Sequence, residues 1–223
     1  MNAEQWGPTA IKAIRYTFGI PYGDFNVRRF LTSTLLFLFL FLQPTLAAIL
    51  TVSVTGQLKS IQLAVELAHP GDTIFVQKGT YREGNMIIRK PLTIIGLDFP
   101  VLDGELKYEI FTVAADNVTL EGFRMINTGI ASISDIAAVK GLDVSRLRVI
   151  NNQFENTFFG IHLSNSNNCL IEGNTLSSNA LSEHQIGNGI HLWKCDHITI
   201  SRNQIHGHRD GIYFEFVTNS LVS

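Results

Sequence analysis

The chain of 223 residues is poor in charge, since Asp, Glu, Lys and Arg make up only 16% of it and the formal net charge is -2. An excess of positive charge is absent, and with it the basic surface that attracts nucleic acid. The chain has only two cysteines, Cys169 and Cys195. They lack the close paired spacing of thiolate metal sites. We therefore expect no nucleic-acid partner and no metal site built on cysteine.

An apolar run near the N-terminus is typical of an export signal. Arg28 and Arg29 precede an unbroken Leu/Phe stretch from Leu35 to Leu42, and the small residues Ala47 and Ala48 follow. This order of charged, apolar and small residues is that of a secretory signal. The run is shorter than the roughly 20 residues that span a bilayer. We interpret residues 1–48 as an N-terminal extension and Sec signal, with a retained anchor as the alternative.

The remainder of the chain repeats. Short apolar-polar-apolar segments begin at Val118, Leu147, Cys169 and Ile198, which are separated by 29, 22 and 29 positions. Each 29 equals a coil of 22 residues plus an insertion of seven. Insertions of this kind bulge from the turns of a solenoid without disturbing its stack.

Two further columns share this period. Asn recurs after the strands at Asn152, Asn174 and Asn203, where we expect a ladder of turn residues, because Asn tolerates left-handed backbone and bonds the Asn of the next coil. A second strand family reads Gly-Ile-His-Leu at residues 160–163 and 189–192, and Gly-Ile-Tyr-Phe at residues 211–214. By the two-residue period of a strand, the Ile and Leu side chains face inward and the His side chains outward to solvent.

Coils of about 22 residues leave no room for crossover helices, so the pattern predicts an all-β fold, a right-handed parallel β-helix. Residues 56–223 form this domain. A short amphipathic helix from Ser60 to Ala68, stopped by Pro70-Gly71, is expected to cap its N-terminal end. The sequence stops at the next expected strand, near Ser223, and we expect the solenoid to be C-terminally truncated.

Two stretches carry a resemblance to a known family. Gly-Asn-Gly-Ile-His-Leu-Trp at residues 187–193 and Ile-His-Gly-His-Arg-Asp-Gly-Ile-Tyr-Phe-Glu-Phe at residues 205–216 resemble the NosD family of periplasmic β-helix proteins. The opening at residues 71–98 also looks like the start of that family. The resemblance spans residues 56–223 and implies a pectin-lyase-like solenoid.

The function implied by the resemblance is that of a periplasmic accessory protein for maturation of nitrous oxide reductase. Such a protein is not itself an enzyme, and it assists copper delivery or assembly of the copper-sulfide centre. The implied partners are the ATPase and permease subunits of an ABC-type transporter, a copper chaperone and the reductase. Membrane association would then come through these partners.

The residues themselves offer one candidate metal site, for which copper is the expected ion. His162 and His191 occupy the same outward position in successive coils, so their Cβ atoms should lie about 4.8 Å apart. Imidazole suits copper and borderline metals. His184, in the second insertion, could supply a third ligand. The alternative for the pair is a polar ladder facing solvent.

A different class of function stays open. β-Helix proteins that cleave acidic polysaccharides need clustered carboxylates on adjacent coils, and the repeat strands show none. This absence counts against cleavage but does not exclude it. The alternative to the maturation factor is a β-helix carbohydrate-binding protein or a polysaccharide lyase or hydrolase.

Overall fold

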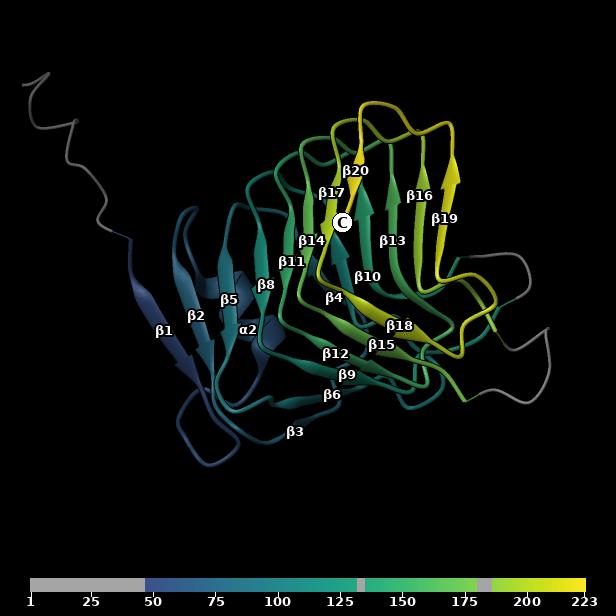
Figure 1. The fold of residues 1–223 in the computed structure, drawn as a ribbon. Coiled ribbons are helices and arrows are strands. Elements are labelled where there is room, and N and C mark those ends of the chain that lie inside the picture. The colour runs from purple at the N-terminus through teal and green to yellow at the C-terminus, as the bar shows by residue number, and fades with distance from the viewer. Residues whose placement is uncertain (1–46, 132–134, 180–185) are drawn as a thin grey trace, which may run out of the picture. The chain divides into compact units, whose positions relative to one another are not determined.

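The computed structural model describes residues 47–131, 135–179 and 186–223. In this part of the chain, short strands wind into a solenoid, and the strands of successive coils form three sheets of parallel strands along its length (Figure 1). The expected signal at residues 1–48 lies almost wholly outside the described residues. No helix in the described ranges is long and apolar enough to cross a membrane.

The first sheet contains the strand family that the repeat predicts. Its strands, in order, are β1 (Ile49–Val52), β2 (Thr73–Val76), β5 (Thr93–Gly96), β8 (Thr119–Glu121), β11 (Arg148–Ile150), β14 (Leu170–Glu172), β17 (Thr199–Ser201) and β20 (Leu221–Val222). The register pairs Arg148 with Thr119 and with Leu170, which reproduces the spacings of 29 and 22 residues. The inserted residues therefore leave the stack undisturbed.

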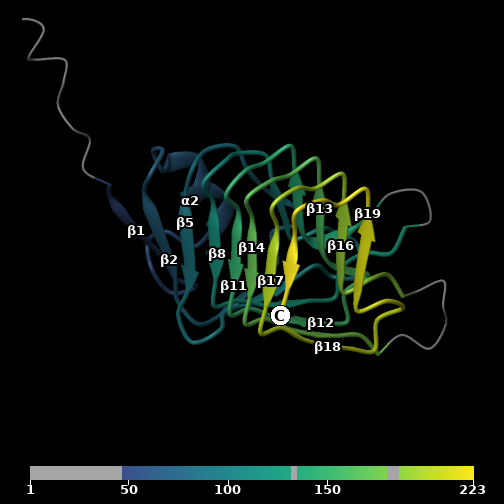
Figure 2. The same cartoon turned by 45° about the horizontal axis from the view of Figure 1, so that its top comes forward.

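The other two sheets complete each coil, as both views show (Figures 1 and 2). The second sheet runs through β4 (Met86–Ile88), β7 (Phe111–Val113), β10 (Ala137–Leu142), β13 (Phe159–Ser164), β16 (Ile190–Trp193) and β19 (Ile212–Glu215). The third runs through β3 (Thr80–Tyr81), β6 (Val101–Asp103), β9 (Arg124–Ile126), β12 (Gln153–Glu155), β15 (Thr175–Ser177) and β18 (Gln204–His206). All described pairings are parallel, which confirms the predicted fold.

The solenoid begins earlier than residue 56, where the sequence pattern placed its start. Strand β1 pairs with β2 in parallel, and the side chain of Val52 is fully buried. The backbone N–H of Thr73 donates to the carbonyl of Ala48. The sequence pattern did not reveal β1, because the first coil contains the capping helix in place of a regular strand and therefore lacks the repeat.

Helix α2 (Ile61–Leu67) closes the first coil as predicted. The hydroxyl of Ser60 accepts a hydrogen bond from the N–H of Leu63, which is the usual N-cap. Ile61, Ala64 and Val65 are buried against the end of the core. The helix therefore covers apolar side chains that the first coil would otherwise expose.

The asparagine ladder is present, with one correction to its backbone. Asn152 and Asn174 donate backbone N–H groups to the side-chain oxygens of Asn174 and Asn203, each at 2.9 Å. Positive φ angles fall one residue earlier, for example at Asn151 and Gly173. The role of the ladder residues is therefore to form inward hydrogen bonds, and the residue before each of them has the left-handed backbone of the turn.

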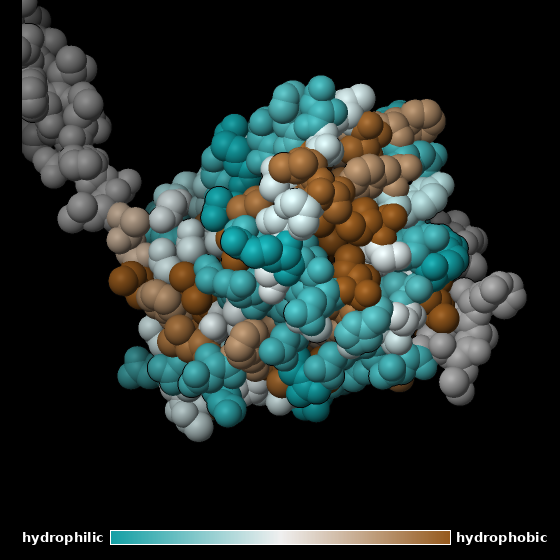
Figure 3. Space-filling model, viewed as in Figure 1, coloured by the Kyte–Doolittle hydropathy of each residue, from teal (hydrophilic) through white to brown (hydrophobic). Residues whose placement is uncertain are grey.

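The core lies inside the bore of the solenoid. Inward side chains of successive strands stack in columns, such as Leu120, Val149, Ile171 and Ile200 in the first sheet. Cys169 and Cys195 are both buried and free. Exposed apolar side chains gather at the coil of β19 and β20, where Phe216 is 71% and Leu221 59% exposed (Figure 3).

Candidate functional site

The histidine column predicted from the sequence lies on the outer face of the second sheet. The register aligns Lys140 with His162, His162 with His191, and His191 with Tyr213. The rings of His162 and His191 stack, with centroids 4.8 Å apart and planes inclined by 16°. The structure thus brings the two predicted site residues into direct contact.

Contrary to expectation, His162 does not face solvent, because it is only 6% exposed. The ring of Phe159 lies 5.8 Å from that of His162 and 5.4 Å from that of His191. On another side, the carboxylate of Asp135 lies 3.9 Å from Nδ1 of His162. The two-residue period correctly gave the face of the sheet, but it does not say what covers that face.

Burial keeps this pair neutral. Loss of water around His162, followed by repulsion from His191, lowers its pKa to about 4, and burial also lowers the pKa of His191. Among described residues, Nδ1 of His162 and both nitrogens of His191 have no hydrogen-bond partner. Two neutral imidazoles with unpaired nitrogens are the form that metals bind.

The ring geometry limits how the pair could hold an ion. An imidazole binds metal in its own plane, at about 2.0–2.1 Å from the nitrogen. Because the two rings are stacked, at least one must turn before both nitrogens can reach one ion. The described residues contain no group of three potential ligands, and His184 lies outside them. Copper ligation by His162 and His191 stays a prediction.

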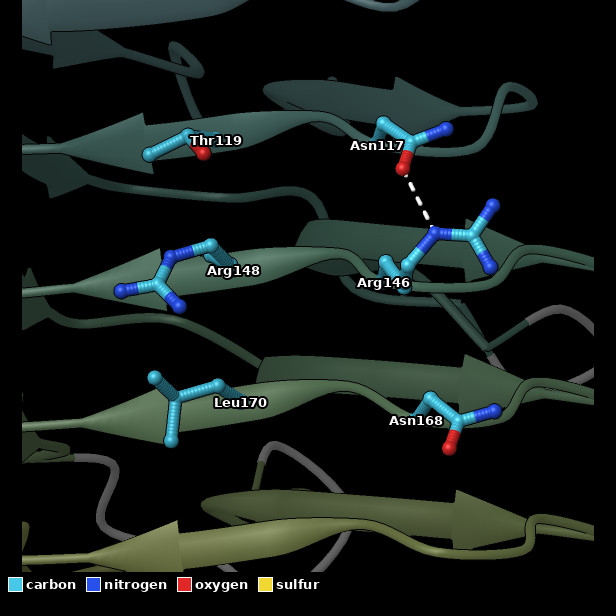
Figure 4. Close-up of a pocket in the computed structure, with 6 residues that line it drawn as sticks. All are labelled: Asn117, Thr119, Arg146, Arg148, Asn168 and Leu170. Atoms are coloured by element: carbon cyan, nitrogen blue, oxygen red, sulfur yellow. Dashed lines mark hydrogen bonds between the residues drawn. The ribbon is translucent and has the colours of Figure 1, made fainter.

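A groove that the sequence did not reveal crosses the outer face of the first sheet. We call its first part the basic pocket, which has a volume of about 320 Å³ (Figure 4). Its lining comes from three successive coils: Asn117 and Thr119, Arg146 and Arg148, and Asn168 and Leu170. The turn residues form one column and the first strand residues the other.

The two arginines of this pocket differ in their contacts. Nε of Arg146 donates to the side-chain oxygen of Asn117 at 2.6 Å, and its guanidinium lies 3.9 Å from the Asp116 carboxylate. Arg148 is exposed and forms no ion pair or side-chain hydrogen bond with any described residue. Arg148 therefore leaves its full set of donors for a ligand.

The groove continues into a second part of about 440 Å³, which we call the histidine pocket. Asn168 and Leu170 line both parts, and the remaining lining residues are Cys169, His197, Thr199, Asn219 and Leu221. Nδ1 of His197 lies 2.5 Å from a carboxylate oxygen of Asp196. The other oxygen of Asp196 accepts hydrogen bonds from Thr218 Oγ1 and Asn219 Nδ2.

These contacts fix the charge of Asp196. The hydrogen bonds from Thr218, Asn219 and His197, in that order, lower its pKa to about 2. The carboxylate is therefore ionised, and the nitrogen of His197 that faces it acts as the donor. The adjacent pair Asp196-His197 was the available sequence signal, but turn residues of a solenoid are usually structural, so it did not stand out.

Comparison with known proteins supports the fold. Residues 137–223 match the family described as right handed beta helix region. Polygalacturonase from Erwinia carotovora ssp. carotovora has a similar structure, with a TM-score of 0.62 and 11% identity, covering 81% of this chain and 63% of its own. A rhamnogalacturonan lyase gives a TM-score of 0.47 and 12% identity, covering 77% and 62%. No curated protein matches.

These findings confirm a right-handed parallel β-helix of the pectin-lyase-like type. The chain spans less than two thirds of the length of those two structures. At such low identity the likeness extends to the fold alone. The resemblance to the NosD family, with its transporter, chaperone and reductase partners, stays a prediction.

Proposed function

We propose that this chain is a carbohydrate-binding β-helix that holds an acidic polysaccharide in the groove of the first sheet. The observation that carries the proposal is Arg148, whose exposed guanidinium has no partner among the described residues and lies in an open groove. Arginine pairs with carboxylates through two parallel hydrogen bonds. A uronic acid sugar supplies that carboxylate.

The groove is also laid out for a repeating ligand. It crosses the strands from coil to coil, at a step of about 4.8 Å. A polysaccharide chain advances by a similar distance per sugar, so each coil can meet one sugar. Asn117, Thr119 and Asn168 offer hydrogen-bonding groups to sugar hydroxyls, and Leu170 offers an apolar surface to a ring face.

Binding without hydrolysis fits the chemistry of the lining residues. Hydrolysis of a glycosidic bond generally needs a carboxylate pair flanking the bond. The described residues that line the basic pocket include no Asp or Glu. A carboxylate in contact with them, that of Asp116, is paired with Arg146 and with the N–H of Ser145.

The test is calorimetric titration of the chain with oligogalacturonate and with a neutral oligosaccharide of equal length. We expect binding of the acidic ligand only, weakened at least tenfold by Arg148→Gln. Arg89→Gln is the matched control, since Arg89 is exposed and lies just beyond β4, on another sheet. Equal affinity of wild type and Arg148→Gln would overturn the proposal. Release of reducing ends or unsaturated sugars would identify a cleaving enzyme instead.

A second candidate is the copper maturation role that the family resemblance implies. The observation in its favour is the stacked pair of imidazoles at His162 and His191, both of which have lowered pKa values. Anaerobic Cu(I) titration of wild type and of the His162→Ala/His191→Ala double variant tests it. A marked loss of affinity in the double variant is expected for a copper site, and unchanged affinity rules the pair out.

A further inference from the structure

The two parts of the groove adjoin but differ in chemistry. Register places Arg148, Leu170, Thr199 and Leu221 in one column along the solenoid axis. The basic pocket lies at one end of this column and the histidine pocket at the other, with Leu170 common to both. A ligand lying lengthwise therefore meets a cationic end and a different end about two coils away.

The histidine pocket presents a fixed hydrogen-bonding group. Asp196 engages Nδ1 of His197, which fixes the orientation of the imidazole ring and leaves Nε2 for a ligand. Thr218 and Asn219 hold the carboxylate from the next coil. The His197 side chain is 58% exposed, so a ligand can reach it. This arrangement suits a sugar hydroxyl, which can both donate and accept a hydrogen bond.

Charge and apolar surface exclude a second uronate from the same place. The Asp196 carboxylate places a negative charge beside the pocket, and a like charge on a ligand is repelled. Leu170 and Leu221 flank Thr199 in the column, and Leu221 is 59% exposed. An apolar substituent on an uncharged sugar, such as a methyl or acetyl group, gains by covering these side chains.

We infer that the groove is directional and selects a heteropolysaccharide, with a uronate in the basic pocket and an uncharged sugar bearing a methyl or acetyl group in the histidine pocket. The inference rests on the proposed function, because it concerns the same groove. It names the class of ligand more narrowly: a mixed acidic and neutral chain is preferred over a uniform polyuronate.

The experiment compares two probes of equal length: a uniform oligogalacturonate, and a mixed oligosaccharide in which a galacturonate segment is joined to a segment of the 6-deoxy sugar rhamnose, so that a uronate and an uncharged sugar can occupy pockets two coils apart. We expect wild type to prefer the mixed probe. His197→Gln and Leu221→Ser should each weaken binding of the mixed probe about tenfold and leave binding of the uniform probe nearly unchanged. Asp196→Asn should strengthen binding of the uniform probe, because the charge that repels a uronate is removed. His206→Gln is the matched control, since His206 is exposed on the third sheet.

The outcomes separate the two proposals. If Arg148→Gln weakens both probes but His197→Gln and Leu221→Ser change neither, the groove binds acidic sugars and the directional inference is wrong. If neither probe binds to wild type, the proposed function and the inference fail together. Thermal unfolding of each variant checks the fold, and an Asp196→Asn protein with unaltered preference also contradicts the inference.

Discussion

The imidazole rings of His162, which is buried, and His191, which is partly buried, are stacked with centroids 4.8 Å apart. Burial first, and His191 second, lower the pKa of His162 from 6.5 to about 4, while Lys140 acts in the same direction and Asp135 opposes it. Because protonation is harder in the folded chain than in the unfolded chain, protons favour unfolding. The stabilisation is complete above pH 6.5 and is lost as the pH falls towards 4.

We expect the free energy of unfolding to drop on acidification through this window, by about 3 kcal/mol for His162 alone at about 1.4 kcal/mol per pH unit. His162→Phe should flatten the fall, since Phe cannot take up a proton. Urea unfolding of wild type and variant at pH 7 and pH 4.5 measures the difference. His206→Phe, on an exposed histidine, is the control and should keep the wild-type slope. An equal fall in both variants would contradict the assignment.

Much of this fold could be predicted from the sequence because a solenoid repeats its local interactions. The strand at Arg148–Ile150 lies within one residue of its predicted place, and the spacings of 29 and 22 recur in the register. The asparagine ladder followed from the same period. Strand β1 was missed because its coil contains a helix in place of the repeat.

The candidate sites were harder to predict, since they depend on contacts between columns. Sequence period placed His162 and His191 together, but the cover over them comes from Asp135 and Phe159, which lie outside that column. The groove at Arg148 has no motif, because its residues are single members of several coils. The sequence repeat specifies which side chains stack on one another. It does not specify the shape of the groove beside them, because that shape depends on the turns.

The ladder predicts a large loss of stability for Asn174→Ala. The side chain of Asn174 accepts from the N–H of Asn152 and donates to the carbonyl of Val149, both at 2.9 Å and both buried. Truncation leaves these backbone groups unpaired, which costs about 1–3 kcal/mol for each. The midpoint of urea unfolding measures the loss. Asn85→Ala, at an exposed position, should change it by less than about 0.5 kcal/mol.

The cap of the solenoid depends on Glu83. Its carboxylate accepts hydrogen bonds from the backbone N–H groups of Ile61 and Gln62, at 2.8 and 3.0 Å, and from the hydroxyl of Ser60. These are donors that the helix cannot satisfy itself. Glu83→Ala should destabilise α2 by about 1–2 kcal/mol and speed amide hydrogen exchange there first. Glu66→Ala, on the exposed face of the same helix, should leave exchange nearly unchanged.

The glycines that open the second strand family make a prediction with its own internal control. A Cβ added at Gly189 would lie 2.5 Å from Cγ2 of Ile205 and 2.7 Å from the backbone oxygen of Gly211. A backbone oxygen in a parallel ladder cannot move without breaking the pairing, so the strain is not relieved by a rotamer change. Gly160 meets the same obstruction, from Leu176 and from the backbone oxygen of Gly189.

Gly211 occupies the equivalent position in the last described coil, where no following coil faces it, and an added Cβ there meets nothing within 4 Å. We therefore expect Gly189→Ala to lower the free energy of unfolding by about 1–3 kcal/mol. Gly211→Ala should leave it unchanged or raise it slightly, because alanine restricts the unfolded chain. Urea unfolding of the two variants decides the matter. Equal effects at both positions would mean that close approach of neighbouring coils does not explain why glycine stands before each Ile in this strand family.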